Sequence, residues 1–174
     1  MLKLFLPDFQ VNSIYEIDLD DLRARGIKGI ITDLDNTLVG AKDKLATPQL
    51  VEWLKRVRAA GLGVVIVSNN RRARVSGVAE PLGIPYIYSA RKPTTRAFRR
   101  ALAILGLQPK ETLMVGDQML TDVFGANRMG MHTLLVQPIA AKDEGVMTRV
   151  NRRLEKLVIR RLKRLGYQWE ESKR

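Results

Sequence analysis

Short apolar runs rich in β-branched residues alternate along this chain with segments of helical periodicity, and this alternation constrains the fold more than any other feature. The runs that predict strands are residues 28–32, 63–67, 84–88, 112–115 and 132–136. The segments that predict helices between them are residues 49–60, 73–82, 94–105 and 121–129. Strands that alternate with helices of about ten residues are typical of βαβ units. We therefore expect an α/β fold, a Rossmann-like three-layer αβα sandwich around a mainly parallel five-stranded sheet.

Polar residues follow four of the predicted strands, near the point where each strand ends. Asp33 follows the first strand, Ser68 the second and Asp117 the fourth, while Lys92 lies shortly after the third. In parallel sheets, ligands bind outside the carboxyl ends of the strands, where the strand order reverses. The sequence therefore predicts that these four positions converge on one crevice.

Two acids separated by one residue, Asp33 and Asp35, give this crevice its first candidate chemistry. A carboxylate can attack a phosphoryl group and form an aspartyl-phosphate. Asp33 is then the candidate nucleophile and Asp35 the candidate general acid and base. By itself the pair is a weak signal, because Asp33 could simply cap the turn after its strand.

Asp117 and Asp122 lie in a second acidic segment, Gly-Asp-Gln-Met-Leu-Thr-Asp, after the fourth strand. Mg²⁺ prefers oxygen ligands and keeps several of its waters. We expect Asp33 and Asp117 to bind Mg²⁺ directly, together with the backbone carbonyl of Asp35. Asp122 could bind through water, orient the other ligands or cap the following helix.

Hydroxyl, amide and ammonium groups near the same strand ends are candidates for binding a phosphate. The expected substrate-binding residues are Thr37, Ser68, Asn69 and Lys92. Lys92 would also bridge the nucleophile and the phosphoryl group, because phosphoryl transfer depends on positioning and charge neutralisation. Two alternatives remain open: Ser68 and Asn69 could serve only the turn that they occupy, and Lys92 could be a solvated loop charge.

Over residues 28–136 the chain resembles the haloacid dehalogenase (HAD) superfamily of phosphatases, whose four motifs occur in a fixed order. The matching positions are Asp33-Leu-Asp35-Asn-Thr37-Leu, then Ser68, Lys92, and Gly116-Asp117 with Asp122. The resemblance implies a Rossmann-like sheet, a Mg²⁺ site at Asp33, Asp35, Asp117 and Asp122, and catalysis by Asp33, Asp35 and Lys92. It also implies one HAD-like domain over residues 1–174, with residues 28–136 as its catalytic core.

A narrower resemblance includes the segment before the first motif. Leu6-Pro-Asp-Phe, Val11, Ser13-Ile-Tyr-Glu-Ile-Asp18-Leu and Lys92-Pro-Thr are similar to the bacterial YqeG-type branch of the superfamily. That branch is similar to the mitochondrial phosphatidylglycerophosphate phosphatase of fungi. The resemblance implies phosphatidylglycerophosphate as the substrate and phosphatidylglycerol as the product.

The spacing of the motifs leaves no room for a cap domain, as in the capless subclass III of the superfamily. Only 34 residues separate Asp33 from Ser68, and 23 separate Ser68 from Lys92. An uncovered crevice can admit a phosphate on a lipid, a nucleic-acid end or another protein. A small metabolite is possible if subunits cover one another's sites.

The net charge of +12 favours anionic partners, and much of it lies near the C-terminus. Residues 149–164 contain eight Lys or Arg and one acid, within a predicted amphipathic helix over residues 148–166. Its apolar residues fall within an arc of about 140°; they are Val150, Leu154, Leu157, Val158, Leu162 and Leu165. Such a helix can lie on a membrane surface or pack on its own domain, and Tyr167 and Trp169, which follow it, are residue types common at lipid interfaces. The apolar N-terminal residues 2–9 leave the same two possibilities, core packing or a shallow anchor.

Composition excludes several other classes of function. The chain has no cysteine and one histidine, which excludes thiolate metal sites, cysteine nucleophiles and poly-histidine metal sites. Its apolar runs are shorter than the ~20 residues of a membrane span, so we expect a cytoplasmic protein, with possible peripheral contact at the inner face of the plasma membrane.

The main hypothesis is a Mg²⁺-dependent phosphomonoesterase that forms an aspartyl-phosphate and acts on phosphatidylglycerophosphate. The alternatives are a phosphatase on nucleic-acid ends or on another large or small phosphorylated substrate, and a non-enzymatic regulatory binding protein.

Overall fold

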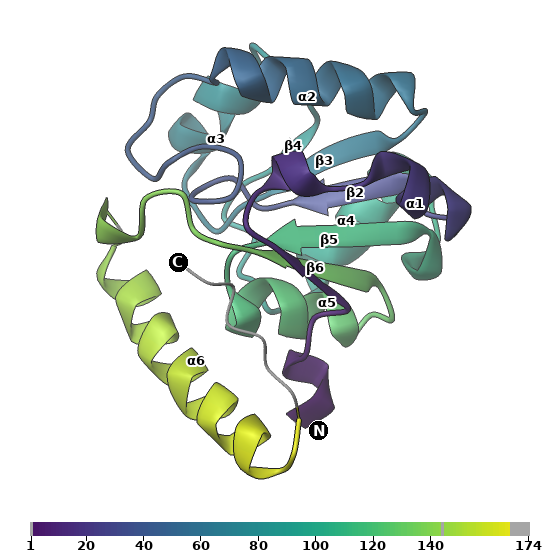
Figure 1. The fold of residues 1–174 in the computed structure, drawn as a ribbon. Coiled ribbons are helices and arrows are strands. Elements are labelled where there is room, and N and C mark those ends of the chain that lie inside the picture. Colours follow the sequence, from purple (N-terminus) through teal and green to yellow (C-terminus); the bar gives the residue numbers. More distant parts are fainter. Residues whose placement is uncertain (1, 144, 168–174) are drawn as a thin grey trace.

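The computed structural model describes residues 2–143 and 145–167, and a parallel β-sheet lies at its centre (Figure 1). Its six strands have the order β1-β6-β5-β2-β3-β4, and every neighbouring pair is parallel. The strands are β1 (Phe9–Val11), β2 (Gly29–Thr32), β3 (Gly63–Val67), β4 (Tyr86–Ile87), β5 (Thr112–Gly116) and β6 (His132–Val136). The predicted α/β class and parallel sheet are confirmed, but the sheet has six strands rather than five.

The additional strand, β1, is an edge strand formed by the N-terminal segment. Phe9 pairs in register with Leu134, and Val11 with Val136. With only three residues, β1 is too short to give a recognisable pattern in the sequence. It covers the edge of β6, so this part of the N-terminal segment belongs to the sheet.

Helices cover both faces of the sheet (Figure 1). One face carries α1 (Leu19–Ala24), α2 (Pro48–Ala59) and α3 (Arg72–Ala79), and the other carries α4 (Thr95–Leu105) and α5 (Phe124–Asn127). The helix expected over residues 121–129 is interrupted: a π-helical turn, Met119–Val123, precedes the short α5. This turn brings the side chain of Asp122 back to accept a hydrogen bond from the N–H of Gln118, at 3.1 Å.

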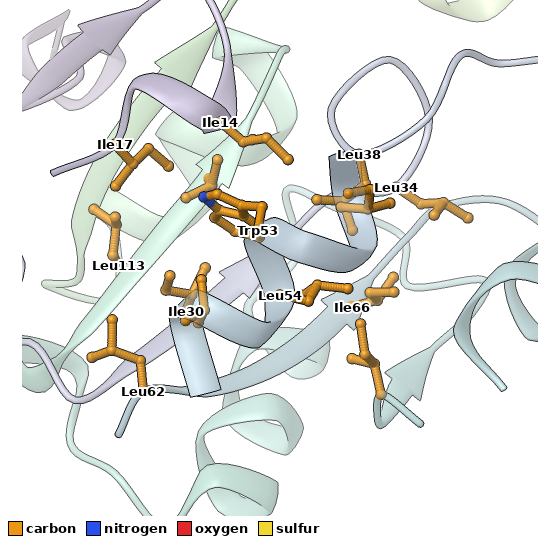
Figure 2. Close-up of a cluster of buried hydrophobic side chains, with 14 of the residues drawn as sticks. Ile14, Ile17, Ile30, Leu34, Leu38, Trp53, Leu54, Leu62, Ile66 and Leu113 are labelled. Atoms are coloured by element: carbon orange, nitrogen blue, oxygen red, sulfur yellow. The ribbon is translucent and has the colours of Figure 1, made fainter. Parts of the chain in front are cut away.

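The core on the α2 face shows why this layer forms. Thr47 accepts a hydrogen bond from the N–H of Leu50, and Pro48 fixes the first helical position, so α2 begins there. Trp53 lies on the buried face of α2 and is 2% exposed. Figure 2 shows it among aliphatic side chains that include Ile14 and Ile30. Trp53 thus packs α2 against the core on this face of the sheet.

The sheet carries no cap, and its carboxyl edge adjoins one further helix. Residues 34–67 hold α2, β3 and their loops, and residues 69–91 hold α3, β4 and their loops, so neither segment forms a lid. Helix α6 (Val146–Arg164) lies beside the carboxyl ends of the strands, outside both helical layers (Figure 1). Within residues 2–143 and 145–167, no helix has the length and apolar content needed to cross a membrane.

Candidate active site

The loops after β2, β3, β4 and β5 meet at the carboxyl edge of the sheet and enclose a hollow of about 320 Å³. Eight residues from the sheet side line it: Asp33, Asp35, Ser68, Asn69, Asn70, Lys92, Gln118 and Thr121. Helix α6 supplies the rest of the wall with Met147, Thr148 and Asn151. The predicted convergence of the strand ends is therefore present in the structure.

Lys92 links two carboxylates at the floor of this hollow. Its Nζ lies 2.7 Å from Oδ1 of Asp33 and 2.7 Å from Oδ1 of Asp122, and all three side chains are buried. Burial alone would lower the pKa of Lys92, but the Asp122 and Asp33 carboxylates outweigh it and hold that pKa above its usual value. Lys92 is therefore a permanent positive charge inside the site, and not a solvated loop residue.

Asp33, Asp117 and Asp122 form a cluster whose ligand oxygens lie within 4.8 Å of one another. Burial raises the pKa of Asp33 to about 6, although Lys92 opposes this rise. Burial also raises the pKa of Asp117 well above its usual value, against the effect of Arg152. The three carboxylates, when ionised, carry three negative charges, and the neighbouring cations Lys92 and Arg152 supply only two positive charges. Carboxylate oxygens are also the ligands that a hard divalent ion prefers. The donor set therefore fits the metal that the sequence predicted.

Asp35 is held apart from this cluster by its own partners. Its Oδ1 accepts hydrogen bonds from Arg74, whose Nε lies at 2.9 Å, and its Oδ2 accepts one from Nδ2 of Asn70 at 2.9 Å. Arg74 also donates to the backbone carbonyl of Gly40, which ties the loop after β2 to α3. Arg74 lies 39 residues after Asp35, and no pattern in the sequence pointed to this pairing.

The residue between Asp35 and Thr37 shapes the loop. Asn36 has a φ of 65°, a left-handed conformation that asparagine tolerates better than most residues. Its backbone carbonyl accepts a hydrogen bond from the N–H of Ile139, and its Oδ1 accepts one from the N–H of Ala140. The segment after β6 is thereby fastened to the loop that carries both candidate catalytic acids.

Of the four expected phosphate-binding residues, Ser68, Asn69 and Lys92 line the hollow, and Thr37 is not among the residues that line it. Ser68 accepts a hydrogen bond from the N–H of Asn70, so its hydroxyl also serves the turn. Asn69 exchanges two hydrogen bonds with the backbone of Lys92 and fixes the loop that presents the ammonium group. Thr37 donates to Oδ1 of Asp117 at 3.3 Å, next to the carboxylate cluster.

Glycine is required at position 116 because the side chain of Asp122 lies directly against its Cα atom. A Cβ atom at Gly116 would collide with the Asp122 carboxylate. That carboxylate accepts the N–H of Gln118 and contacts Lys92, so it both closes the π-helical turn and belongs to the charged cluster. Asp122 thus does not cap the N-terminus of a helix in the way considered from the sequence.

Helix α6 contributes residues that sequence reasoning missed. Arg152 donates to Oδ2 and to the backbone carbonyl of Asp117. Its partner Glu155 is buried, and its Oε1 accepts the N–H of Leu120 at 3.1 Å. Asn151 donates to Oε1 of Gln118 at 3.1 Å. These polar contacts dock α6 on the domain. The only signal for them in the sequence is Glu155, a single acid three residues after Arg152 in an otherwise basic helix.

The apolar residues of α6 are divided between two environments. Leu162 is buried, and Val158 and Ile159 are partly buried, as packing on the domain requires. The remaining apolar side chains of α6, and that of Leu165 just after it, are 42–73% exposed: Val146, Met147, Val150, Leu154, Leu157 and Leu165. The expected single apolar face is therefore split, and most of it faces outward. Trp169 lies outside the described residues.

Comparison with known proteins identifies the family of this chain. A family model described as HAD-hydrolase-like matches residues 89–151, and one described as mitochondrial PGP phosphatase matches residues 2–81. The chain is 51% identical to a probable phosphatase, YqeG, of Bacillus subtilis (strain 168), over 97% of this chain and 98% of that protein.

Two further similarities are more distant. Phosphatidylglycerophosphate phosphatase 1 of Arabidopsis thaliana is 29% identical over 92% of this chain, which spans about half (49%) of that protein's length. The fold is shared with D,D-heptose 1.7-bisphosphate phosphatase from B. bronchiseptica, whose structure is complexed with magnesium and phosphate. That similarity has a TM-score of 0.54 and 20% identity, and covers 64% of this chain and 82% of the other.

Proposed function

Since the chain belongs to the YqeG branch of the HAD superfamily and is a phosphatase, we propose that it hydrolyses the phosphate monoester of phosphatidylglycerophosphate through an aspartyl-phosphate on Asp33. The observation that carries the reaction type is the position of Lys92, 2.7 Å from the carboxylates of both Asp33 and Asp122 inside the hollow. A buried cation beside a buried carboxylate can neutralise an incoming phosphate and leave the carboxylate oxygen close to phosphorus.

In the first step, a carboxylate oxygen of Asp33 attacks the phosphorus atom. A new O–P bond forms, the ester O–P bond breaks, and the leaving alkoxide takes a proton from the carboxylic acid of Asp35. In the second step, Asp35 removes a proton from a water molecule that attacks the same phosphorus atom. The bond between the Asp33 oxygen and phosphorus breaks, inorganic phosphate leaves, and Asp33 is again a carboxylate and Asp35 again a carboxylic acid.

The surrounding residues assist both steps. Arg74 and Asn70 hold the Asp35 carboxyl in one orientation. Ser68 lines the hollow with its hydroxyl group, whereas Thr37 donates its hydroxyl hydrogen to Asp117 and so steadies the carboxylate cluster. Asn69 keeps the backbone of Lys92 in place. Each group is fixed before substrate arrives, which lowers the reorganisation that the reaction requires.

HAD phosphatases generally depend on a metal, and we propose Mg²⁺ here, held by Asp33, Asp117 and the backbone carbonyl of Asp35, with Asp122 beside them. When bound, Mg²⁺ would neutralise phosphate oxygens and the excess negative charge of the cluster.

The lipid substrate is supported by the related phosphatidylglycerophosphate phosphatases and by the surface of α6. The exposed apolar stripe of α6 is flanked by exposed basic residues, among them Arg153, Lys156 and Arg160. Apolar side chains beside lysine and arginine favour an anionic bilayer surface. We propose that this stripe places the uncapped site against the membrane that contains the substrate.

The test is phosphate release from phosphatidylglycerophosphate in mixed micelles, with Mg²⁺ or with EDTA. The wild type is compared with Asp33→Asn and with Asp20→Asn, a control that neutralises an exposed carboxylate on α1. We expect release that requires Mg²⁺ and Asp33 and is unchanged in the control. Release from an aryl phosphate but not from the lipid would retain the phosphatase and reject this substrate, and no release from either would contradict the proposed reaction.

A further inference from the structure

Helix α6 reaches the carboxylate cluster through Arg152. The guanidinium group donates to Oδ2 of Asp117 and to the backbone carbonyl of the same residue. Arg152 belongs to a helix that lies beside the strand ends and outside both helical layers (Figure 1). Of the two cations at the cluster, Lys92 is therefore part of the sheet edge, whereas Arg152 is carried by a peripheral element.

The carboxylates that would bind a divalent ion already have cationic partners from the chain itself. Asp117 accepts from Arg152, and Asp33 and Asp122 share the ammonium group of Lys92. The three ligand oxygens lie within 4.8 Å of one another, so an ion bound among them would lie near the guanidinium that contacts Asp117. Like charges repel strongly in a buried site, because little solvent separates them. The guanidinium and the divalent ion therefore oppose each other at this carboxylate.

The attachment of α6 to the domain depends strongly on the same arginine. The helix contacts chiefly the N-terminal turn, Leu2–Phe5, and the π-helical turn, Met119–Val123. Only two of its side chains are buried, Glu155 and Leu162. Glu155 is itself a partner of Arg152, at 3.3 Å. Loss of the contact between Arg152 and the cluster would thus remove a large share of what holds the helix in place.

We propose that Arg152 competes with the divalent ion for the Asp117 carboxylate, so that α6 is a metal-sensitive latch: it is docked while the cluster lacks its ion and loosens when the ion binds. This inference rests on the proposed metal site and is independent of the lipid substrate. Two binding events that oppose each other weaken one another by the same factor, so the docked helix also lowers the affinity for Mg²⁺. Since α6 forms one wall of the hollow, its release also opens that side of the site.

The first measurement is the Kd for Mg²⁺, determined by calorimetry at pH 7.5 on the metal-free protein without substrate. Arg152→Gln removes the competing charge and should bind Mg²⁺ about tenfold more tightly than the wild type. Arg153→Gln removes the same charge from the next, exposed position and should keep the wild-type Kd within about twofold, because solvent and salt screen exposed charges. If Arg152 only held Asp117 or the helix in place, its loss would weaken Mg²⁺ binding or leave it unchanged.

The second measurement uses the wild type and so does not depend on the folding of a variant. Tryptic cleavage within residues 146–164 is followed in EDTA and in saturating Mg²⁺. Mg²⁺ should accelerate this cleavage about tenfold, the same factor as in the first measurement, while the sheet core is cleaved no faster. In Arg152→Gln the helix is already loosened, so its cleavage should be fast in EDTA and should not respond to Mg²⁺.

Equal or weaker Mg²⁺ binding by Arg152→Gln overturns the latch and leaves the metal site intact. Equal or slower cleavage of wild-type α6 in Mg²⁺ also overturns it. If Mg²⁺ binds to neither protein, the proposed metal site fails and the latch fails with it. Neither measurement follows turnover, so a protein that meets both expectations yet hydrolyses no phosphate monoester would support the latch and contradict the proposed function alone.

Discussion

Two regions supply the walls of the catalytic hollow, and they are held in place by different forces. The strand-end loops carry Asp33, Lys92 and Asp122 as a buried charge network at the edge of an apolar sheet. Helix α6 docks through polar contacts, chiefly Arg152 and Glu155, and leaves most of its apolar side chains exposed. In the first region Lys92 lies between two carboxylates, so a change to any one of the three alters the electrostatic balance of the others. Helix α6 is docked on the domain by a few polar contacts, so substitutions in it should change the stability of the fold less.

Removing Lys92 is expected to have the largest effect. Lys92→Gln leaves the buried carboxylates of Asp33 and Asp122 without their shared cation, which costs about 3 kcal/mol of unfolding free energy. Turnover should fall about 100-fold or more. Urea unfolding in EDTA and phosphate release measure the two effects. Lys55→Gln, an exposed position on α2, should stay within about 0.5 kcal/mol of the wild type; equal losses in both variants would contradict the distinction.

The positions of the strand-end residues could be predicted because they depend on few assumptions. A parallel sheet brings its carboxyl ends together, so Asp33, Ser68 and Asp117 were placed in one site once the strands were located. β1 was missed because three residues at a sheet edge carry no periodic signal. Arg74 and Arg152 were missed for another reason: each reaches an aspartate more than 30 residues away, and the sequence contains many arginines equally able to do so.

Helix α6 shows how an amphipathic pattern can be detected while its orientation stays undetermined. The apolar arc was correct as a feature of the sequence, yet the helix turns Asn151, Arg152 and Glu155 toward the acidic strand edge. Complementary charge at the site decides this orientation, because a buried carboxylate such as Asp117 is costly without a cationic partner. That partner could be assigned only after the helix had been placed beside the sheet.

Neutralising Asp33 should stabilise the metal-free protein, and the effect should depend on pH. The pKa of Asp33 is about 6 in the folded protein, above its ordinary value of 3.8. The unfolded state therefore ionises first, and wild-type stability falls as the pH rises from 4 through 6. Asp33→Asn lacks this penalty, so its advantage at pH 7.5 should exceed that at pH 4 by about 2 kcal/mol.

Urea titrations in EDTA at the two pH values measure this difference. Adding Mg²⁺ should remove the advantage at pH 7.5, because the ion binds the ionised wild-type cluster and stabilises it. An advantage that is equal at both pH values would show that the Asp33 carboxylate is not under strain in the folded protein.

Loosening α6 should have a moderate effect. Arg152→Gln weakens the contact with Asp117 and leaves Glu155 without its cation, which costs about 1–2 kcal/mol. Because this loss concerns the docking of α6, tryptic cleavage within residues 146–164 should become several-fold faster, while the tryptic resistance of the sheet core is retained. Arg153→Gln changes the adjacent, exposed arginine, and trypsin should cleave this variant at the wild-type rate at every site except the one that is lost. Uniform cleavage throughout the Arg152→Gln chain would mean that α6 is an integral part of the core.

The outward stripe of α6 should matter least for the fold and most for the membrane. Leu157 is 57% exposed, so Leu157→Gln should change the unfolding free energy by less than about 0.5 kcal/mol and leave glycerol 3-phosphate turnover within twofold. Binding to anionic phosphatidylglycerol vesicles, measured by sedimentation, should nevertheless weaken several-fold, because the substitution removes apolar area from the surface that would enter the interface. Ile104→Gln on α4 removes a similarly exposed side chain from a different face and should leave vesicle binding unchanged. If the two variants bind vesicles equally well, the exposed leucines of α6 do not form the membrane contact. Helix α6 then contributes to the site only through Asn151, Arg152 and Glu155.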